Sequence, residues 1–248
     1  MARRTRVAMR ALRTPRAAST AATMDLAHID TWLFDLDNTL YPPSAGLFAH
    51  IDVKMGQFIQ RLLGVDPVEA RRVQKRFFHE HGTTLRGLMN EHGVEPGEFL
   101  DYVHDIDMDT LGPDLRLVRA MERLPGRKLI FTNADTAYAQ RVLARLGLGD
   151  AFGAIHCIHG MDYRPKPDPV AYAILIERYG IDPTRALFVE DMARNLEPAK
   201  ALGMTTVWVD NGSESGGHGA RANYIDLRIA DTSAWLDSLT FGARAVAA

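Results

Sequence analysis

The chain has 248 residues, of which 46% are hydrophobic and 24% are charged, a composition that is ordinary for a soluble globular protein. No apolar run approaches the length that crosses a bilayer, so we expect no membrane partner. Cys157 is the single cysteine, which excludes an intramolecular disulfide and favours a reducing, cytoplasmic setting.

The formal net charge of −2 is unevenly distributed along the chain. Residues 1–24 contain six arginines and no acidic residue, whereas the rest of the chain has 23 basic residues against 31 acidic ones. An acidic body gives no reason to expect nucleic acid as a partner. We interpret residues 1–24 as a disordered, Arg-rich extension, with an organelle-targeting presequence as the alternative, and exclude them from the fold.

Two carboxylates follow the first predicted strand, which covers residues 29–34. Because burying a carboxylate is costly, Asp35 should lie at the open end of this strand. Asp35 and Asp37 are spaced i and i+2, so on an extended chain they face the same way. Two ionised acids that converge repel each other, and a hard, oxygen-preferring cation such as Mg2+ would relieve that repulsion.

A long helical stretch comes next. Apolar residues recur at helical spacing from 45 to 63, and Pro67, Pro96 and Pro113 stand where further helices would begin. A simple strand–helix–strand crossover needs far fewer residues. We therefore predict an inserted, all-helical cap domain over residues 43–124. We expect its aromatic residues to form its hydrophobic core, with the inner face of the cap as the alternative; these residues are Phe77, Phe78, Phe99 and Tyr102.

Alternating strands and helices fill the rest of the chain. This alternation predicts an α/β fold with a doubly wound, parallel, Rossmann-like sheet, formed by residues 25–42 and 125–248. In such sheets, ligands bind outside the carboxyl ends of the strands. Beyond the first strand, we expect strands at 128–131, 152–158, 186–189, 205–209 and 225–229, and helices at 135–146, 168–179, 192–202 and 232–239.

Polar residues follow several of these strands. Thr132 and Asn133 end the second strand, and Glu190 and Asp191 end the fourth. Lys166 lies in a segment with three prolines at alternate positions, which restricts where its amine can reach. Taken singly, each signal has a plain alternative: a helix cap, a solvated lysine or an acidic helix start.

Together, these residues resemble the four motifs of the haloacid-dehalogenase (HAD) superfamily, of the phosphatase type with a helical cap. Asp35 to Leu40 matches the Asp-x-Asp-x-Thr motif, and Thr132, Lys166 and Asp191 follow in the family's order. The resemblance implies a Mg2+-dependent phosphatase. Its nucleophile is Asp35, which forms an aspartyl-phosphate, and its general acid and base is Asp37.

The resemblance also implies the remaining roles. The Thr132 hydroxyl, the Asn133 backbone N–H and Lys166 would bind the phosphoryl group. The metal ligands would be Asp35, Asp37 through its backbone carbonyl, and Asp191. Glu190 and Asn195 depart from the family's more common aspartates; Glu190 would reach the metal through water, and Asn195 would hydrogen-bond the Lys166 loop.

The expected substrate is a small-molecule phosphomonoester. Asp35 to Pro42, with Asn38 and the Tyr41-Pro42 pair, is similar to the opening of the pyrimidine 5'-nucleotidase branch, so a pyrimidine nucleoside 5'-monophosphate is one candidate. The plain alternative is that Tyr41 packs at the hinge of the cap. A phosphomutase, a sugar or glycolate phosphatase, and a non-catalytic phosphate-binding protein stay open, whereas a dehalogenase has no use for Asp37.

Two histidine-containing clusters are weaker metal candidates. His79 and His81 diverge around a helix, so a solvated face is the better interpretation. His156, Cys157 and His159 lie along a predicted strand without a complete ligand set, and we treat Cys157 as a small buried residue. The sequence makes no prediction of the oligomeric state.

Overall fold

The computed structural model describes residues 25–241, so the Arg-rich extension predicted at 1–24 lies outside the described residues. Within them, six parallel strands form one sheet in the order β3-β2-β1-β4-β5-β6. Its strands are β1 (Thr31–Phe34), β2 (Arg127–Phe131), β3 (Ala154–His156), β4 (Ala186–Glu190), β5 (Thr205–Val209) and β6 (Leu227–Ile229). The doubly wound α/β prediction is confirmed.

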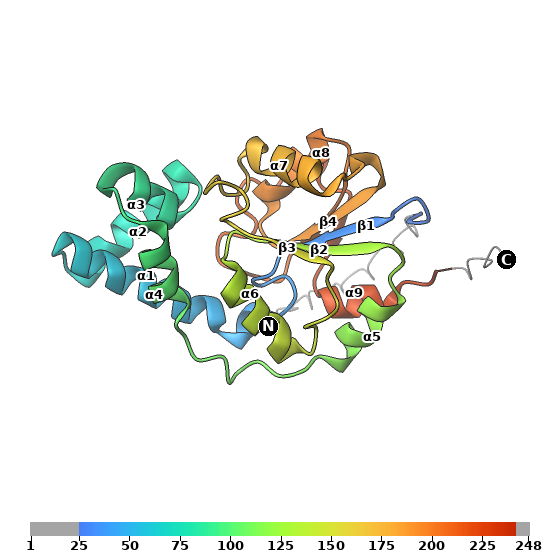
Figure 1. Ribbon diagram of the computed structural model, residues 1–248, viewed down its shortest axis with the longest axis horizontal. Helices are drawn as coiled ribbons and strands as arrows, with labels where there is room; N and C mark the ends of the chain where they lie inside the picture. Colours follow the sequence, from blue (N-terminus) through green and yellow to red (C-terminus); the bar gives the residue numbers. More distant parts are fainter. Residues whose placement is uncertain (1–24, 242–248) are drawn as a thin grey trace, which may run out of the picture.

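Apolar side chains explain why β1 and β4 are central strands. Every residue of both strands is buried, as expected for strands covered on both faces. In Figure 1, α7 (Pro169–Tyr179) and α8 (Leu196–Ala201) cover one face, and α6 (Thr136–Leu146) and α9 (Thr232–Ser238) cover the other. Strand order reverses between β1 and β4, so their carboxyl ends mark the crevice where such sheets bind ligands.

The strand predicted at 152–158 is wrong in its length. β3 comprises only residues 154–156, because it is an edge strand that pairs with β2 alone. Its register ends where β2 ends, with Phe131 opposite His156. The chain then turns, and the Ile158 N–H donates to the Ala134 carbonyl at 3.1 Å.

Four helices form the body that we predicted as a cap. Local signals set their ends: Gly64 adopts the left-handed conformation that ends the first, and the Asp66 carboxylate caps the second by accepting from the Val68 and Glu69 N–H groups. Phe58 of the first helix and Phe99 of the fourth pack edge to face, with 5.2 Å between their ring centroids. The helices are α1 (Leu47–Leu63), α2 (Pro67–His81), α3 (Thr84–His92) and α4 (Pro96–His104).

The next helix, α5 (Leu115–Arg123), was assigned to the cap by our 43–124 boundary, but it packs against α9. Asp237 of α9 forms ion pairs with Arg116 at 3.1 Å and Arg123 at 2.9 Å. Figure 1 shows α5 beside α9 and apart from α1 to α4. We therefore propose that the cap ends with α4. The boundary was misplaced because the sequence shows that α5 is amphipathic but does not show which part of the protein covers its apolar face.

Helices within residues 25–241 are all too short or too polar to cross a membrane.

Candidate active site

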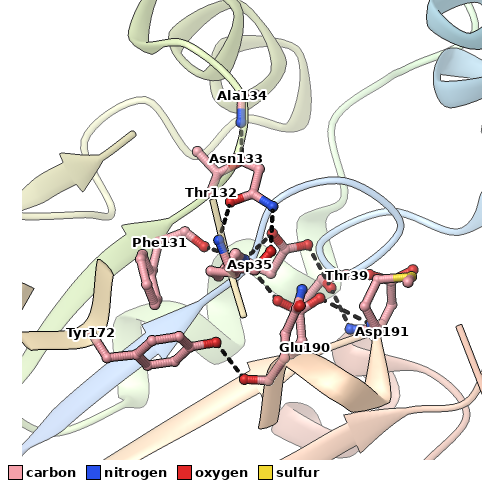
Figure 2. Close-up of polar contacts among 12 residues, drawn as sticks. Asp35, Thr39, Phe131, Thr132, Asn133, Ala134, Tyr172, Glu190 and Asp191 are labelled. Atoms are coloured by element: carbon pink, nitrogen blue, oxygen red, sulfur yellow. Dashed lines mark hydrogen bonds and ion pairs between the residues drawn. The ribbon is translucent and has the colours of Figure 1, made fainter. Parts of the chain in front are cut away.

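Lys166 joins the carboxyl ends of three strands. Its Nζ donates to the Asp35 carboxylate after β1, to the Phe131 carbonyl at the end of β2 and to the Glu190 carboxylate at the end of β4, each at 2.7 Å. The Lys166 residue is only 1% exposed. Figure 2 shows the carboxylates of Asp35 and Glu190 converging from neighbouring strands. The expected meeting of the first, third and fourth motifs is thus present.

The charges of this group depend on one another. Burial raises the pKa of Asp35 to about 7, and Glu190 adds to the rise while Lys166 opposes it. Burial alone would lower the pKa of Lys166, but Asp35 and Glu190 outweigh burial and raise it. Lys166 is therefore held as a cation, and it is the group that favours the ionised form of Asp35.

Asn133 fixes the Lys166 loop. Its side-chain amide donates to the Lys166 carbonyl at 3.2 Å, and its Oδ1 accepts from the Lys166 N–H at 2.9 Å. We expected Asn195 to bond this loop, and that expectation is wrong. The Asn195 Oδ1 is buried and has no hydrogen-bond partner among residues 25–241.

A cluster of acids lies beside Lys166. Carboxylate oxygens of Asp35, Glu190 and Asp191 all lie within 4.8 Å of one another. Burial, Glu190 and Asp35 together raise the pKa of Asp191 well above its usual range. Thr39 ties the cluster together: its hydroxyl donates to Asp35 at 3.1 Å and accepts from the Asp191 N–H at 3.1 Å.

This cluster fits a divalent cation. The donors are hard carboxylate oxygens, and burial together with mutual repulsion raises the pKa of Asp35 and Asp191, so a bound cation would favour their ionised forms. The two oxygens of Glu190 already accept from Lys166 Nζ at 2.7 Å and from the Met192 N–H at 3.0 Å. The two oxygens of Asp35 likewise accept, from Lys166 Nζ at 2.7 Å and from the Thr39 hydroxyl at 3.1 Å, so all three carboxylates stay candidate ligands.

Thr132 lies at the wall of the same pocket and is 1% exposed. Its backbone N–H donates to the His156 carbonyl at 3.0 Å, which continues the pairing of β2 with β3 beyond the strand. Its hydroxyl oxygen accepts from the Ala134 N–H at 3.1 Å. Among residues 25–241 the hydroxyl donates to no acceptor, so its proton is available to a ligand.

The surroundings of Asp37 were only partly foreseen. Its Oδ1 accepts from the hydroxyls of Tyr41 and, at 2.7 Å, Tyr138. The His104 ring stacks on the Tyr138 ring, 4.3 Å between centroids, and its Nδ1 bonds to Asp135. The sequence drew attention to Tyr41, but it gave no signal for Tyr138 or His104, which come from a core helix and a cap helix.

A pocket of about 170 Å³ opens between these residues and the cap. Asp35, Asp37, Thr132, Lys166 and Asp191 line its core side. The cap residues along it are both apolar and polar. The apolar ones are Phe48, Ile51, Met55, Phe78, Leu85, Phe99, Leu100 and Val103, and the polar ones are Asp52, Gln74, Lys75, Thr83, Thr84 and His104.

The predicted aromatic core of the cap is present in part. Phe77 is fully buried, and Phe99 is buried but also lines the pocket. Phe78 faces the pocket, where the guanidinium of Arg194 lies 4.2 Å from its ring centroid. Cys157 is buried as expected, and its sulfur accepts from the Thr136 hydroxyl at 3.1 Å.

Comparison with known proteins agrees with this geometry. A family model described as haloacid dehalogenase-like hydrolase matches residues 29–203. Phosphate metabolism protein 8 of Saccharomyces cerevisiae is 28% identical over 191 residues, 70% of this chain but only 59% of the yeast protein. The N-acetylmuramic acid 6-phosphate phosphatase of Pseudomonas aeruginosa is 27% identical over 189 residues, 73% of this chain and 81% of that enzyme.

Solved structures share the fold. A HAD phosphatase from Thermococcus onnurineus superimposes with a TM-score of 0.54 at 20% identity, over 82% of this chain and 94% of that one. The L-2-haloacid dehalogenase of Xanthobacter autotrophicus gives 0.52 at 18% identity, over 84% and 97% of the two chains. At such identities the likeness speaks for the fold alone, since one fold carries several chemistries.

Proposed function

The chain belongs to the haloacid dehalogenase-like hydrolase family, and from this premise we propose that it is a Mg2+-dependent phosphatase that hydrolyses small phosphomonoesters through an aspartyl-phosphate. The observation that carries the proposal is the contact of Lys166 with Asp35 and Glu190 at the open edge of the sheet. A carboxylate beside a pocket, whose ionised form is favoured by a buried lysine, is suited to nucleophilic attack on an anionic group.

The chain's own groups supply the steps. An oxygen of Asp35 forms a bond to phosphorus while the ester P–O bond breaks and leaves its electron pair on the ester oxygen. Asp37 donates a proton to that oxygen and later accepts one from the water that hydrolyses the aspartyl-phosphate. The Thr132 hydroxyl and the Asn133 N–H would hold the phosphoryl oxygens. Lys166, whose three N–H groups contact Asp35, Phe131 and Glu190, would bind the phosphoryl group through its positive charge.

Asp35, the backbone carbonyl of Asp37 and Asp191 would hold Mg2+. When bound, the cation offsets the negative charge of the acids and of the phosphoryl group. Glu190 pairs with Lys166, as Asp35 does, and would reach the metal through water. Asn195, buried nearby, would serve the packing of this turn.

Asp37 favours a phosphatase over a dehalogenase within the family. Displacement of a halide needs no proton donor, whereas an alkoxide leaving group does. A phosphomutase would use the same residues and differ only in admitting a second substrate hydroxyl instead of water. The relatives named above include a phosphatase and no mutase, so we propose hydrolysis.

The cap side of the pocket bears on the leaving group. Its lining includes Phe48 and Phe78, which suit the flat face of a base. The polar cap residues of the same pocket would be available to the ribose hydroxyls. We therefore favour a nucleoside 5'-monophosphate, with the pyrimidine type as first candidate, over the sugar phosphates and phosphoglycolate of other family members.

Phosphate release from a panel of phosphomonoesters in the presence of Mg2+ tests both the phosphatase activity and the preference for a nucleoside monophosphate. The panel contains pyrimidine and purine nucleoside monophosphates, sugar phosphates and phosphoglycolate. Asp35→Asn should lower release on the order of 10³-fold or more, whereas Asp101→Asn, an exposed cap residue, should leave it unchanged. Binding of Mg2+ and phosphate without turnover would instead indicate a non-catalytic phosphate-binding protein.

A further inference from the structure

Two buried tyrosines hold the same oxygen of Asp37. The hydroxyls of Tyr41 and Tyr138 both donate to Oδ1, and the two hydroxyl oxygens lie 3.3 Å apart. Tyr41 is 4% exposed and Tyr138 is 1% exposed. A phenol is protonated at neutral pH, so both hydroxyls act as donors to the carboxylate.

The second oxygen of Asp37 has a different environment. Among residues 25–241, no group donates a hydrogen bond to Oδ2. Asp37 is partly exposed and lines the pocket beside Asp35. A carboxylate that is held through one oxygen, with its other oxygen at a pocket wall, is positioned to react with a group bound in that pocket.

The tyrosines connect Asp37 to the hinge of the cap. Tyr41 lies on the segment that leads from β1 into the cap, and Tyr138 lies on core helix α6. His104, the last residue of α4, stacks on Tyr138 and bonds Asp135, while its carbonyl accepts from Arg141 at 2.7 Å. Both connections between core and cap therefore converge on the anchored side of Asp37.

We propose that Tyr41 and Tyr138 are positioning residues that hold Asp37 through Oδ1 and turn Oδ2 toward the ester oxygen of the substrate. The inference rests on the proposed phosphatase function. When Asp35 bonds to phosphorus, the P–O electron pair goes to the ester oxygen, which takes the proton from Oδ2. His104 keeps the Tyr138 ring in place when the cap is closed.

The test compares Tyr138→Phe, Tyr41→Phe and the double variant on two esters. An alkyl phosphate needs a proton on its leaving oxygen, whereas 4-nitrophenyl phosphate does not. Release of the alcohol is measured in the first turnover, so that hydrolysis of the aspartyl-phosphate does not enter. We expect a loss of about 10²-fold with the alkyl ester and less than about threefold with the nitrophenyl ester.

Tyr102→Phe is the matched control, because it loses one hydroxyl hydrogen bond, to Gln57 at 2.9 Å, within the cap. It should leave both rates unchanged. Equal losses on the two esters, or no loss on either, would overturn the positioning role while leaving the phosphatase proposal intact. Failure of the unmodified protein on every ester would overturn the phosphatase proposal instead.

A crystal structure of the double variant gives a reading that needs no turnover. We expect the Asp37 carboxylate to rotate or to occupy more than one conformation once both hydroxyls are gone. A single carboxylate orientation identical to that of the unmodified protein would show that the tyrosines do not position it.

Discussion

His156 shows what a single buried titratable residue does outside the site. Both ring nitrogens are buried without a hydrogen-bond partner among residues 25–241, and the ring packs near Phe131 and Tyr179. Burial, with a smaller repulsion from Arg178, lowers the pKa of His156 from 6.5 to about 4. Between about pH 4 and pH 6.5, the His156 ring is therefore mostly neutral in the folded chain and mostly protonated in the unfolded chain.

This depressed pKa predicts a pH dependence of stability. Between about pH 6.5 and pH 4 the unfolded state binds more protons than the folded state, so the free energy of unfolding falls as the pH falls. For His156 alone, the loss at pH 5 relative to pH 8 is about 2 kcal/mol. His156→Leu should remove that part of the loss, as measured by urea unfolding at the two pH values.

The exposed His28 provides the comparison for this experiment, because His28→Leu removes a histidine that lies in water. It should change the pH dependence by less than about 0.5 kcal/mol. If His156→Leu kept the full pH dependence of the unmodified protein, the loss would have to come from other groups.

At the residue scale, the positions of side chains were predicted correctly where they depend on short local patterns. Asp35, Lys166 and Asp191 follow strand ends or a proline-rich loop, and parallel strands bring such ends to one edge. The prediction failed where a contact depends on how distant turns meet. Asn133 and Asn195 both follow strand ends, and the sequence does not show which amide reaches the Lys166 loop. The stacking of His104 on Tyr138 was invisible for the same reason.

At the scale of elements, the turn after β4 links the acid cluster to the cap. Arg194 lies in the short 3-10 turn Ala193–Asn195, which begins two residues after Asp191. Its guanidinium donates to the Gly82 carbonyl at the end of α2 at 3.0 Å and lies over the Phe78 ring. One core turn therefore carries both an acid of the cluster and a contact that favours the closed cap.

Loss of this contact should weaken substrate binding more than the chemical step. A cation–π contact and one hydrogen bond are together worth about 1–2 kcal/mol, so Arg194→Met should raise KM about tenfold with little change in kcat. Limited proteolysis without substrate should also become faster, because the open cap is more populated. KM and the cleavage rate are the two measurements.

Arg61→Met is the control for the Arg194 experiment. Arg61 lies 3.8 Å from the Tyr102 ring centroid, so this variant loses a similar contact, but both partners belong to the cap. It should change neither KM nor the cleavage rate. Equal effects of the two variants would mean that helix stability, and not cap closure, is being measured.

Elements were predicted best where their ends have local causes. Gly64, Asp66 and Pro67 fix the boundary between α1 and α2 whatever surrounds it. The length of β3 is set by its partner strand β2, and the packing of α5 is set by α9, so neither follows from its own residues. A hydrophobic pattern predicts a helix or a strand, but it does not show which other element that helix or strand packs against.

At the scale of the whole molecule, the acid cluster couples stability to both pH and Mg2+. Burial and mutual repulsion raise the pKa of Asp35 to about 7 and that of Asp191 well above its usual range. An acid whose folded pKa is raised stabilises the fold below its unfolded pKa and loses that contribution as the pH rises through the folded pKa. Without a cation, this cluster therefore destabilises the protein progressively as the pH rises from about 4 through 7 and above.

Mg2+ should reverse that loss, and do so more strongly at high pH, because protons no longer compete for the carboxylates. At a Mg2+ concentration about 100 times the Kd at pH 8, Mg2+ should stabilise the fold by about 2.7 kcal/mol at pH 8, which is roughly 5 °C in Tm. The same concentration should stabilise it by much less at pH 5.5. The quantity to measure is the difference in Tm between Mg2+ and a chelator at each pH, since this difference cancels the opposite contribution of His156. Asp191→Asn should abolish most of the increment at pH 8, and an increment equal at both pH values would place Mg2+ away from these acids.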